Sequence, residues 1–167
     1  MTKEEMLSEE YGCETLEGFE DAILGITTEC DTLVYGYDKM IDVVMKRDGI
    51  SYGEAMTCIF ENYIRGEEKR NFIIMEWIPK NDNPLGTLFD MCEGSIVMDG
   101  LDKAIIGCTA SPDKHLIYDY EKICEVLMER DGMDYEEAME FTDYNTVRAL
   151  PYMGPLRPYV IYPVENE

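Results

Sequence analysis

One pattern of residues occurs twice in the chain, and it constrains the fold more than any other feature. Residues 37–65 and residues 120–148 align at a constant separation of 83 positions. Between 38–65 and 121–148, 12 of 28 positions are identical. Self-similarity over a segment of this length indicates a structural unit that is used more than once. The sequence therefore predicts a tandem duplication.

Each copy of the pattern predicts two short helices joined by a tight turn. In the first copy, apolar residues recur at a helical period over 40–45. Asp48-Gly49 then ends the helix, because glycine takes the left-handed conformation past a helix end at low cost. Ser51-x-x-Glu54 is a capping box that starts the second helix. The second copy has the equivalents Asp131-Gly132 and Asp134-x-x-Glu137.

Short apolar runs on either side of the helices predict β-strands. Two runs precede the first helix pair, at 21–27 and 32–37, and their short link predicts an antiparallel hairpin. A third run follows at 71–79, and the matching runs of the second copy lie at 103–109, 116–120 and 159–163. The predicted fold class is α+β, with two β-β-α-α-β units that are made of antiparallel strands and related by a pseudo-two-fold axis.

These units divide the chain into five segments. We expect an acidic lead-in over 1–11, a first unit over 12–79, a connector over 80–93, a second unit over 94–163 and a tail over 164–167. Whether the two units form one domain or two is left open. No apolar run approaches the roughly 18 residues of a membrane span, and no secretory signal is visible at the N-terminus. We therefore expect a cytoplasmic protein with no membrane partner.

The composition argues against several classes of site. The formal net charge is −22, from 14 Lys and Arg against 36 Asp and Glu, so direct binding to nucleic acid is not expected. The six cysteines include no C-x-x-C spacing, and the one histidine, His115, falls in a predicted turn without a counterpart in the first copy. We expect no metal, no cofactor and no catalytic residue. An enzyme with an unrecognised site is kept as an alternative.

The acidic residues of the second copy form an ordered array. Glu121, Glu125 and Glu129 are spaced i, i+4, i+8, which places them on one helix face about 6 Å apart. Like charges at this spacing cost stability, and such a row resembles the phosphates of a nucleic acid. The alternative interpretation is a solvated helix face. The next helix continues the array with Glu136, Glu137, Glu140 and Asp143.

Two polar positions near the end of the second helix are shared by both copies. Asn62 and Arg65 correspond to Asn145 and Arg148, and the members of each pair lie about one helical turn apart. They are candidates for a ligand site between the repeats. The alternative is local capping of carbonyl groups and pairing with a neighbouring acid.

The second copy also resembles a group of known proteins. The resemblance is carried by Tyr118-Asp119-Tyr120-Glu121-Lys122, by Met128-x-Arg130-Asp131-Gly132-Met133-x-Tyr135-Glu136-Glu137-Ala138 and by Tyr144-Asn145-Thr146-Val147-Arg148-Ala149-Leu150-Pro151-Tyr152-Met153-Gly154. These stretches are similar to small, mostly uncharacterised proteins encoded by bacteriophages and prophages. The similarity covers 103–163, and 21–65 more weakly. It implies a phage accessory protein that acts in the cytoplasm of a bacterial host.

Acidity and this resemblance together suggest an anti-defence protein, by analogy with the class of anti-CRISPR and anti-restriction proteins. We expect a non-enzymatic inhibitor that binds a basic nucleic-acid-handling enzyme, such as a CRISPR nuclease, and blocks its DNA or RNA channel by mimicry. Tyr152 and Met153 are candidate anchors, because interface hot spots favour aromatic residues. The expected partner-binding residues are Glu121, Glu125, Glu129, Glu136, Glu137, Glu140, Tyr152 and Met153. The alternative is an adaptor or ligand-binding module that uses Asn62, Arg65, Asn145 and Arg148.

Overall fold

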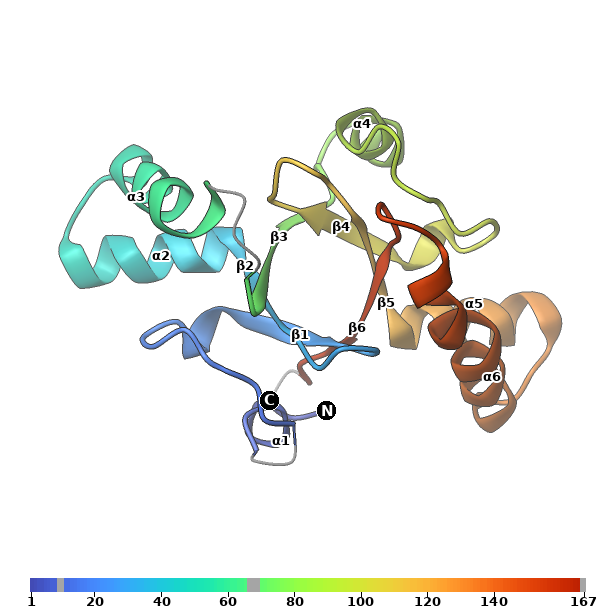
Figure 1. The fold of residues 1–167 in the computed structure, drawn as a ribbon. Coiled ribbons are helices and arrows are strands. Elements are labelled where there is room, and N and C mark those ends of the chain that lie inside the picture. Colours follow the sequence, from blue (N-terminus) through green and yellow to red (C-terminus); the bar gives the residue numbers. More distant parts are fainter. Residues whose placement is uncertain (9–10, 66–69, 166–167) are drawn as a thin grey trace.

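The protein is built around a six-stranded barrel with helices on its outside (Figure 1). The structure is a computed structural model that describes residues 1–8, 11–65 and 70–165. The strands close in the order β1-β2-β3-β4-β5-β6. They are β1 (Ile23–Thr27), β2 (Leu33–Gly36), β3 (Phe72–Trp77), β4 (Ile105–Thr109), β5 (Leu116–Asp119) and β6 (Tyr159–Pro163). The predicted mixture of helices and strands is confirmed.

Each half of the barrel is a hairpin followed by a helix pair and a returning strand. β1 pairs antiparallel with β2, and β4 pairs antiparallel with β5. However, β2 pairs in parallel with β3, and β5 pairs in parallel with β6. The prediction that all strands are antiparallel is therefore wrong at these two places. The reason is the helix pair, which acts as the crossover that a parallel pair requires and returns the chain to the end where the earlier strand began.

The two helix pairs lie on opposite sides of the barrel (Figure 1). Gly49 and Gly132 end the first helix of each pair with φ of +64° and +69°, and both predicted capping boxes are present. The first pair comprises α2 (Tyr37–Asp48), α3 (Tyr52–Ile59) and a π-helical turn η2 (Phe60–Ile64). The second comprises α5 (Tyr120–Asp131), α6 (Tyr135–Phe141), a π-helical turn η4 (Thr142–Thr146) and a 3₁₀ helix η5 (Val147–Tyr152).

The segments outside the two units also belong to the fold. Within the lead-in, α1 (Lys3–Met6) buries Met6 completely in the N-terminal core, while residues 9–10 lie outside the described residues. The connector contains α4 (Pro84–Met91), a helix of eight residues. Two short 3₁₀ helices, η1 (Glu20–Ala22) and η3 (Asp102–Ala104), precede β1 and β4. None of the helices in the described ranges is long and apolar enough to cross a membrane.

The barrel interior holds a cluster with one buried apolar residue from each strand, against which Ile73 and Tyr159 also pack. This cluster consists of Leu24, Val34, Met75, Ile106, Ile117 and Ile161. Because side chains alternate along a strand, the neighbouring strand residues face outward and pack under the helices. Tyr35 and Tyr118, for example, belong to two separate outer clusters, one for each half. The two predicted units thus have their own helix–strand cores and share the interior of one barrel.

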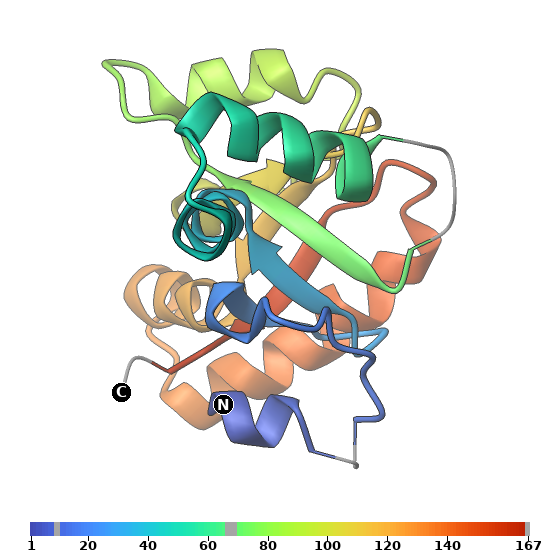
Figure 2. The ribbon, with the colours of Figure 1, turned by 90° about the vertical axis from the view of Figure 1, so that its left-hand side faces the viewer.

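Two antiparallel seams, β3–β4 and β1–β6, join the halves. Each seam contains a glycine at a point of close backbone approach. A Cβ at Gly107 would overlap the carbonyl oxygen of Glu76, and a Cβ at Gly25 would overlap that of Tyr162. Residues from the first and last described segments lie close together beside β1 and β6 (Figure 2), where the amino group of Met1 is 2.8 Å from a carboxylate oxygen of Glu165.

Candidate functional site

The predicted acidic row on α5 is partly engaged in contacts within the protein. The Tyr135 hydroxyl donates to the carboxylate of Glu121, whose two oxygens lie 2.9 and 3.0 Å away. This hydrogen bond raises the pKa of Tyr135 to about 12. Glu129 lies 3.7 Å from the ammonium group of Lys103. Of the three carboxylates, Glu125 alone is exposed and has no partner among the described residues, so the row presents less uncompensated charge than its spacing suggests.

The acidic residues of α6 divide in a similar way. Glu137 completes the capping box by accepting a hydrogen bond from the backbone N–H of Asp134 at 3.0 Å. Glu136 and Glu140 are exposed and have no hydrogen bond or ion pair with any described residue. They lie four residues apart on a helix and therefore share one of its faces. Together with Glu125 of α5, this face of α6 carries negative charge that is not paired with any described residue.

Exposed aromatic side chains accompany these carboxylates. Phe141 and Tyr144 are 39% and 68% exposed. They line a shallow hollow of about 830 Å³ over α6 and η4, which we call the α6 groove. The guanidinium of Arg148 lies 5.0 Å from the centre of the Tyr144 ring, so this ring already receives a cation on its face. The groove is lined by Glu137, Glu140, Phe141, Asp143, Tyr144, Val147, Arg148 and Tyr162.

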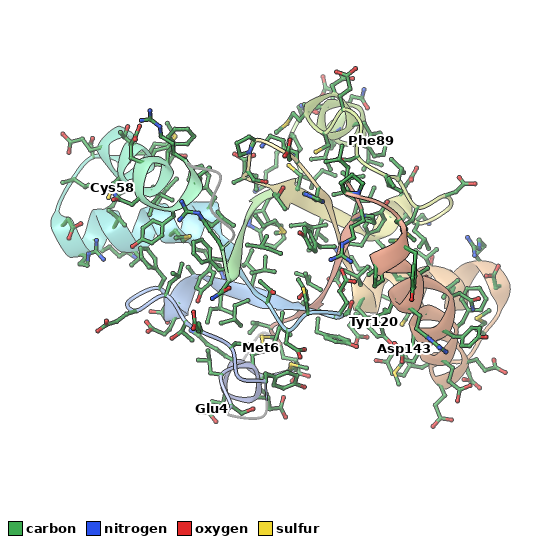
Figure 3. The ribbon with its side chains drawn as sticks, in the orientation of Figure 1. Glu4, Met6, Cys58, Phe89, Tyr120 and Asp143 are labelled. Carbon is green, nitrogen blue, oxygen red and sulfur yellow. The ribbon has the colours of Figure 1, made fainter. Side chains whose placement is uncertain are left out.

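A buried tyrosine fixes one edge of the α6 groove. The Tyr120 hydroxyl donates to a carboxylate oxygen of Asp143 at 2.8 Å (Figure 3). The Tyr120 ring packs against Tyr162, with 4.8 Å between ring centres. Burial raises the pKa of Tyr120, and the Asp143 carboxylate raises it further. Tyr120 therefore keeps its proton and holds Asp143 in one orientation at the groove edge.

The two predicted anchors differ in their surroundings. Tyr152 ends η5 and is 89% exposed, so it is available to a partner. Met153 is partly buried and packs against the C-terminal core. It also lines a separate hollow of about 470 Å³ together with Asn145. Met153 therefore contributes to packing, and Tyr152 is the only one of the pair that presents its side chain to solvent.

The repeated asparagines bond to their own helices. Asn62 donates to the carbonyl oxygen of Cys58 at 2.8 Å, and Asn145 donates to that of Phe141 at 3.1 Å. Both acceptors lie four residues earlier in the chain, at the entry to the π-helical turns. This supports the interpretation that these residues cap carbonyl groups.

The repeated arginines are also used locally. Arg65 forms an ion pair with Glu61 at 2.8 Å, while Arg148 lies over Tyr144. The two Asn–Arg pairs belong to helix pairs on opposite sides of the barrel (Figure 1). The structure thus does not bring Asn62, Arg65, Asn145 and Arg148 together into one site between the repeats.

A second hollow of about 830 Å³ lies at one end of the barrel and was not predicted. It is formed by the turn after β1, the turn after β4, and the first residues of β3 and β6. His115 lines it, in a turn as predicted. The sequence could not show that the turn with His115 would lie opposite a second turn that is distant in the chain.

The described residues offer little for metal or thiol chemistry. Among them, no three His, Cys, Asp or Glu side chains form a group that could hold a metal ion. Burial raises the pKa of Cys108 to about 12 and also raises the pKa of Cys92 and Cys124, which is the opposite of what a nucleophilic thiol requires. Comparisons with protein-family models, with curated proteins and with solved structures found no match to this chain.

Proposed function

We propose that this protein is a non-enzymatic binding protein whose second helix pair holds a basic partner. The observation that carries the proposal is the α6 groove, where exposed aromatic rings lie beside Glu140, a carboxylate with no partner among the described residues. Aromatic residues supply much of the binding energy at protein interfaces, and complementary charge selects the partner. The net charge of −22 adds long-range attraction toward a basic surface.

The partner that fits this surface is a nucleic-acid-handling enzyme such as a CRISPR nuclease. Its channel is rich in Lys and Arg because it neutralises phosphates. Glu125, Glu136 and Glu140 compete with nucleic acid for those side chains. The Tyr144 ring makes a cation–π contact with an arginine of the partner, as it does with Arg148 within the protein. The protein then acts as an inhibitor that occupies the channel. The sequence resemblance to phage and prophage proteins supports a site of action in the cytoplasm of a bacterial host.

The test is binding to a panel of purified CRISPR nucleases, measured by biolayer interferometry at rising salt. The double variant Glu136→Lys/Glu140→Lys should weaken binding at least about tenfold, because it places repulsive charge in the groove at Glu140 and beside it at Glu136. The matched control is Asp42→Lys/Asp82→Lys, which changes the net charge equally at exposed sites of the first helix pair and the connector. This control variant should weaken binding by less than about threefold, because it changes only the long-range electrostatic attraction.

A DNA or RNA substrate of the captured nuclease should displace the protein. Binding that withstands about 1 M salt, where charges are screened within roughly 3 Å, would contradict the electrostatic part of the proposal. An equal loss in the two double variants would contradict the groove as the contact surface. If no nuclease of the panel binds, the proposed partner class is wrong.

We also infer that the halves are copies of one duplicated unit related by a pseudo-two-fold axis. Tyr35 and Tyr118 support this inference, because each lies in the second strand of its hairpin and its hydroxyl accepts a hydrogen bond from a backbone N–H at 2.9 Å. Their parallel partners are Ile74 and Val160. The hairpins also share a register shift at the same point, next to Gly25 and Gly107.

A further inference from the structure

The hollow at the barrel end, which we call the barrel-end cleft, has the size of a small-molecule site. Its volume of about 830 Å³ lies within the range of roughly 300–1,000 Å³ that is typical of ligand pockets. Residues 28–32 and 110–115 are the turns that flank it, and residues 11–14 lie along another side. The cleft is thus built from several separate parts of the chain.

Aromatic rings form much of its wall. Tyr63 and Phe72 meet edge to face, with 6.3 Å between ring centres. Tyr159 lies 5.0 Å from the ring centre of His115. Tyr11 adds a fourth aromatic side chain to the lining. Flat apolar surfaces of this kind favour a planar ligand that can stack on a ring.

A guanidinium group is held in place beside these rings. Arg157 Nη1 lies 2.8 Å from a carboxylate oxygen of Glu29, whose side chain is only 9% exposed. The guanidinium carbon is 6.0 Å from the centre of the Tyr159 ring. Nε and Nη2 of Arg157 have no hydrogen bond to any described residue. Because a guanidinium presents parallel donors, its free edge suits a phosphate or carboxylate group.

His115 adds a polar atom of defined character. Its Nδ1 lies 2.6 Å from the carbonyl oxygen of Arg157. Since a carbonyl oxygen can only accept, Nδ1 carries a proton and Nε2 presents a lone pair when the ring is neutral. Nε2 makes no hydrogen bond with the described part of the chain. The Tyr159 ring packs against His115 at a tilt of 46° and restrains its ring plane, and Nε2 is available to a donor on a ligand.

Two carboxylates limit the charge that the cleft can accept. Glu14 and Asp31 line it, and Glu14 accepts a hydrogen bond from Asn71 at 2.8 Å. The lining also holds Arg70 and Arg157, of which Arg157 is already paired with Glu29. A strand of nucleic acid or a polyphosphate would meet these acids as well as the arginines. One anionic group, placed at Arg157, avoids that repulsion.

We infer that the barrel-end cleft binds a small ligand in which a planar heteroaromatic ring carries one anionic group, the class to which nucleoside monophosphates belong. The ring lies against Tyr159, the anionic group meets the free edge of Arg157, and Nε2 of His115 accepts a hydrogen bond from the ligand. The inference is independent of the proposed function, since none of these three residues lines the α6 groove.

Calorimetric titration of the full chain with the four ribonucleoside 5′-monophosphates, one at a time, tests this inference. At least one should bind saturably, and the corresponding nucleoside should bind at least about tenfold more weakly, because it lacks the group that meets Arg157. The double variant Glu29→Gln/Arg157→Gln should bring the monophosphate to the affinity of the nucleoside. It removes both members of the buried pair together, so no buried charge is left unpaired.

A steric variant provides the second arm. Asn71 is exposed on the cleft wall, so Asn71→Trp should fill the cleft and abolish binding while leaving the thermal unfolding temperature unchanged. The control is Asn81→Trp, at an exposed position of the connector, which should bind as the wild type does.

Four outcomes would overturn the inference. In calorimetry, the first two are the absence of saturable binding by any of the four monophosphates and an equal affinity for nucleoside and monophosphate. The third is that Asn71→Trp binds as the wild type does. The fourth is that the ligand, added to the wild-type protein, leaves the NMR shifts of the backbone amides of His115 and Tyr159 unchanged. The last measurement needs no variant, so it decides the matter even if a substituted chain fails to fold.

Discussion

Substitution of Gly107 by alanine tests the closed barrel directly. Gly107 lies in β4 opposite Trp77 of β3, at one of the seams between the halves. A Cβ at this position would overlap the backbone carbonyl oxygen of Glu76. The obstacle is main chain, which cannot rotate away as a flexible side chain can. The two strands must therefore separate locally to accept the methyl group.

The expected cost follows from two effects. Forcing an extra methyl group into a well-packed interior costs about 1–3 kcal/mol. Separation of the strands also weakens a seam hydrogen bond, which contributes about 0.5–1.5 kcal/mol. We expect Gly107→Ala to lower the free energy of unfolding by about 2–4 kcal/mol, which is a large part of the roughly 5–15 kcal/mol of an ordinary domain.

Urea denaturation provides the measurement, with circular dichroism and tryptophan fluorescence as probes. Trp77 is the single tryptophan and pairs with Gly107, so its fluorescence reports on this seam. The matched control is Gly53→Ala. Gly53 lies in α3, and the place that its Cβ would occupy has no other atom within 4 Å. Alanine there should stabilise the protein by about 0.5–1 kcal/mol.

The same chemical change should thus have opposite signs at the two positions. A Gly107→Ala protein as stable as the wild type would refute the close approach of β3 and β4. A loss of stability in both variants would refute the reasoning from local space, because Gly53 has room for the methyl group.

Three further predictions concern the helices. Ser51→Ala and Asp134→Ala remove equivalent capping boxes and should each lower the free energy of unfolding by about 1 kcal/mol in urea titrations; a large effect in one half only would argue against equivalent units. Met6→Ala should cost about 2–5 kcal/mol, because Met6 is fully buried; unchanged stability would mean that α1 is not docked. Tyr120→Phe should cost about 0.5–1.5 kcal/mol at neutral pH. Because the pKa of Tyr120 is raised above its ordinary value of 10.0, the unfolded chain loses this proton first, so the difference between wild type and variant should shrink above about pH 10. A difference that stays constant to pH 11 would contradict the buried contact with Asp143.

Local features of the fold were predictable because their causes lie within a few residues. Gly49 and Gly132 end helices through their own backbone conformation, and each capping box spans four residues. Strand direction is different. The parallel pairing of β2 with β3 depends on how α2 and α3 pack and return the chain, and no short pattern encodes that.

The candidate site shows the same limit. Helical spacing correctly places Glu121 and Glu129 on α5, but spacing cannot show that Tyr135 and Lys103 lie against them. The barrel-end cleft was missed for a related reason. Each of its turns looks ordinary in the sequence, and the cleft exists only because barrel closure brings the turns after β1 and β4 to the same end.

Neither half of this barrel can close alone. In a separate first half, β1 and β3 would both be edge strands with rows of unpaired N–H and C=O groups, which invite pairing with other chains. In the protein, β6 covers β1 and β4 covers β3. A fragment over 12–79 would satisfy its edges only by pairing with a second fragment, β3 of one against β1 of the other. The connector over 80–93 thus works as a tether, because it keeps the two halves at a high effective concentration and makes barrel closure an intramolecular event.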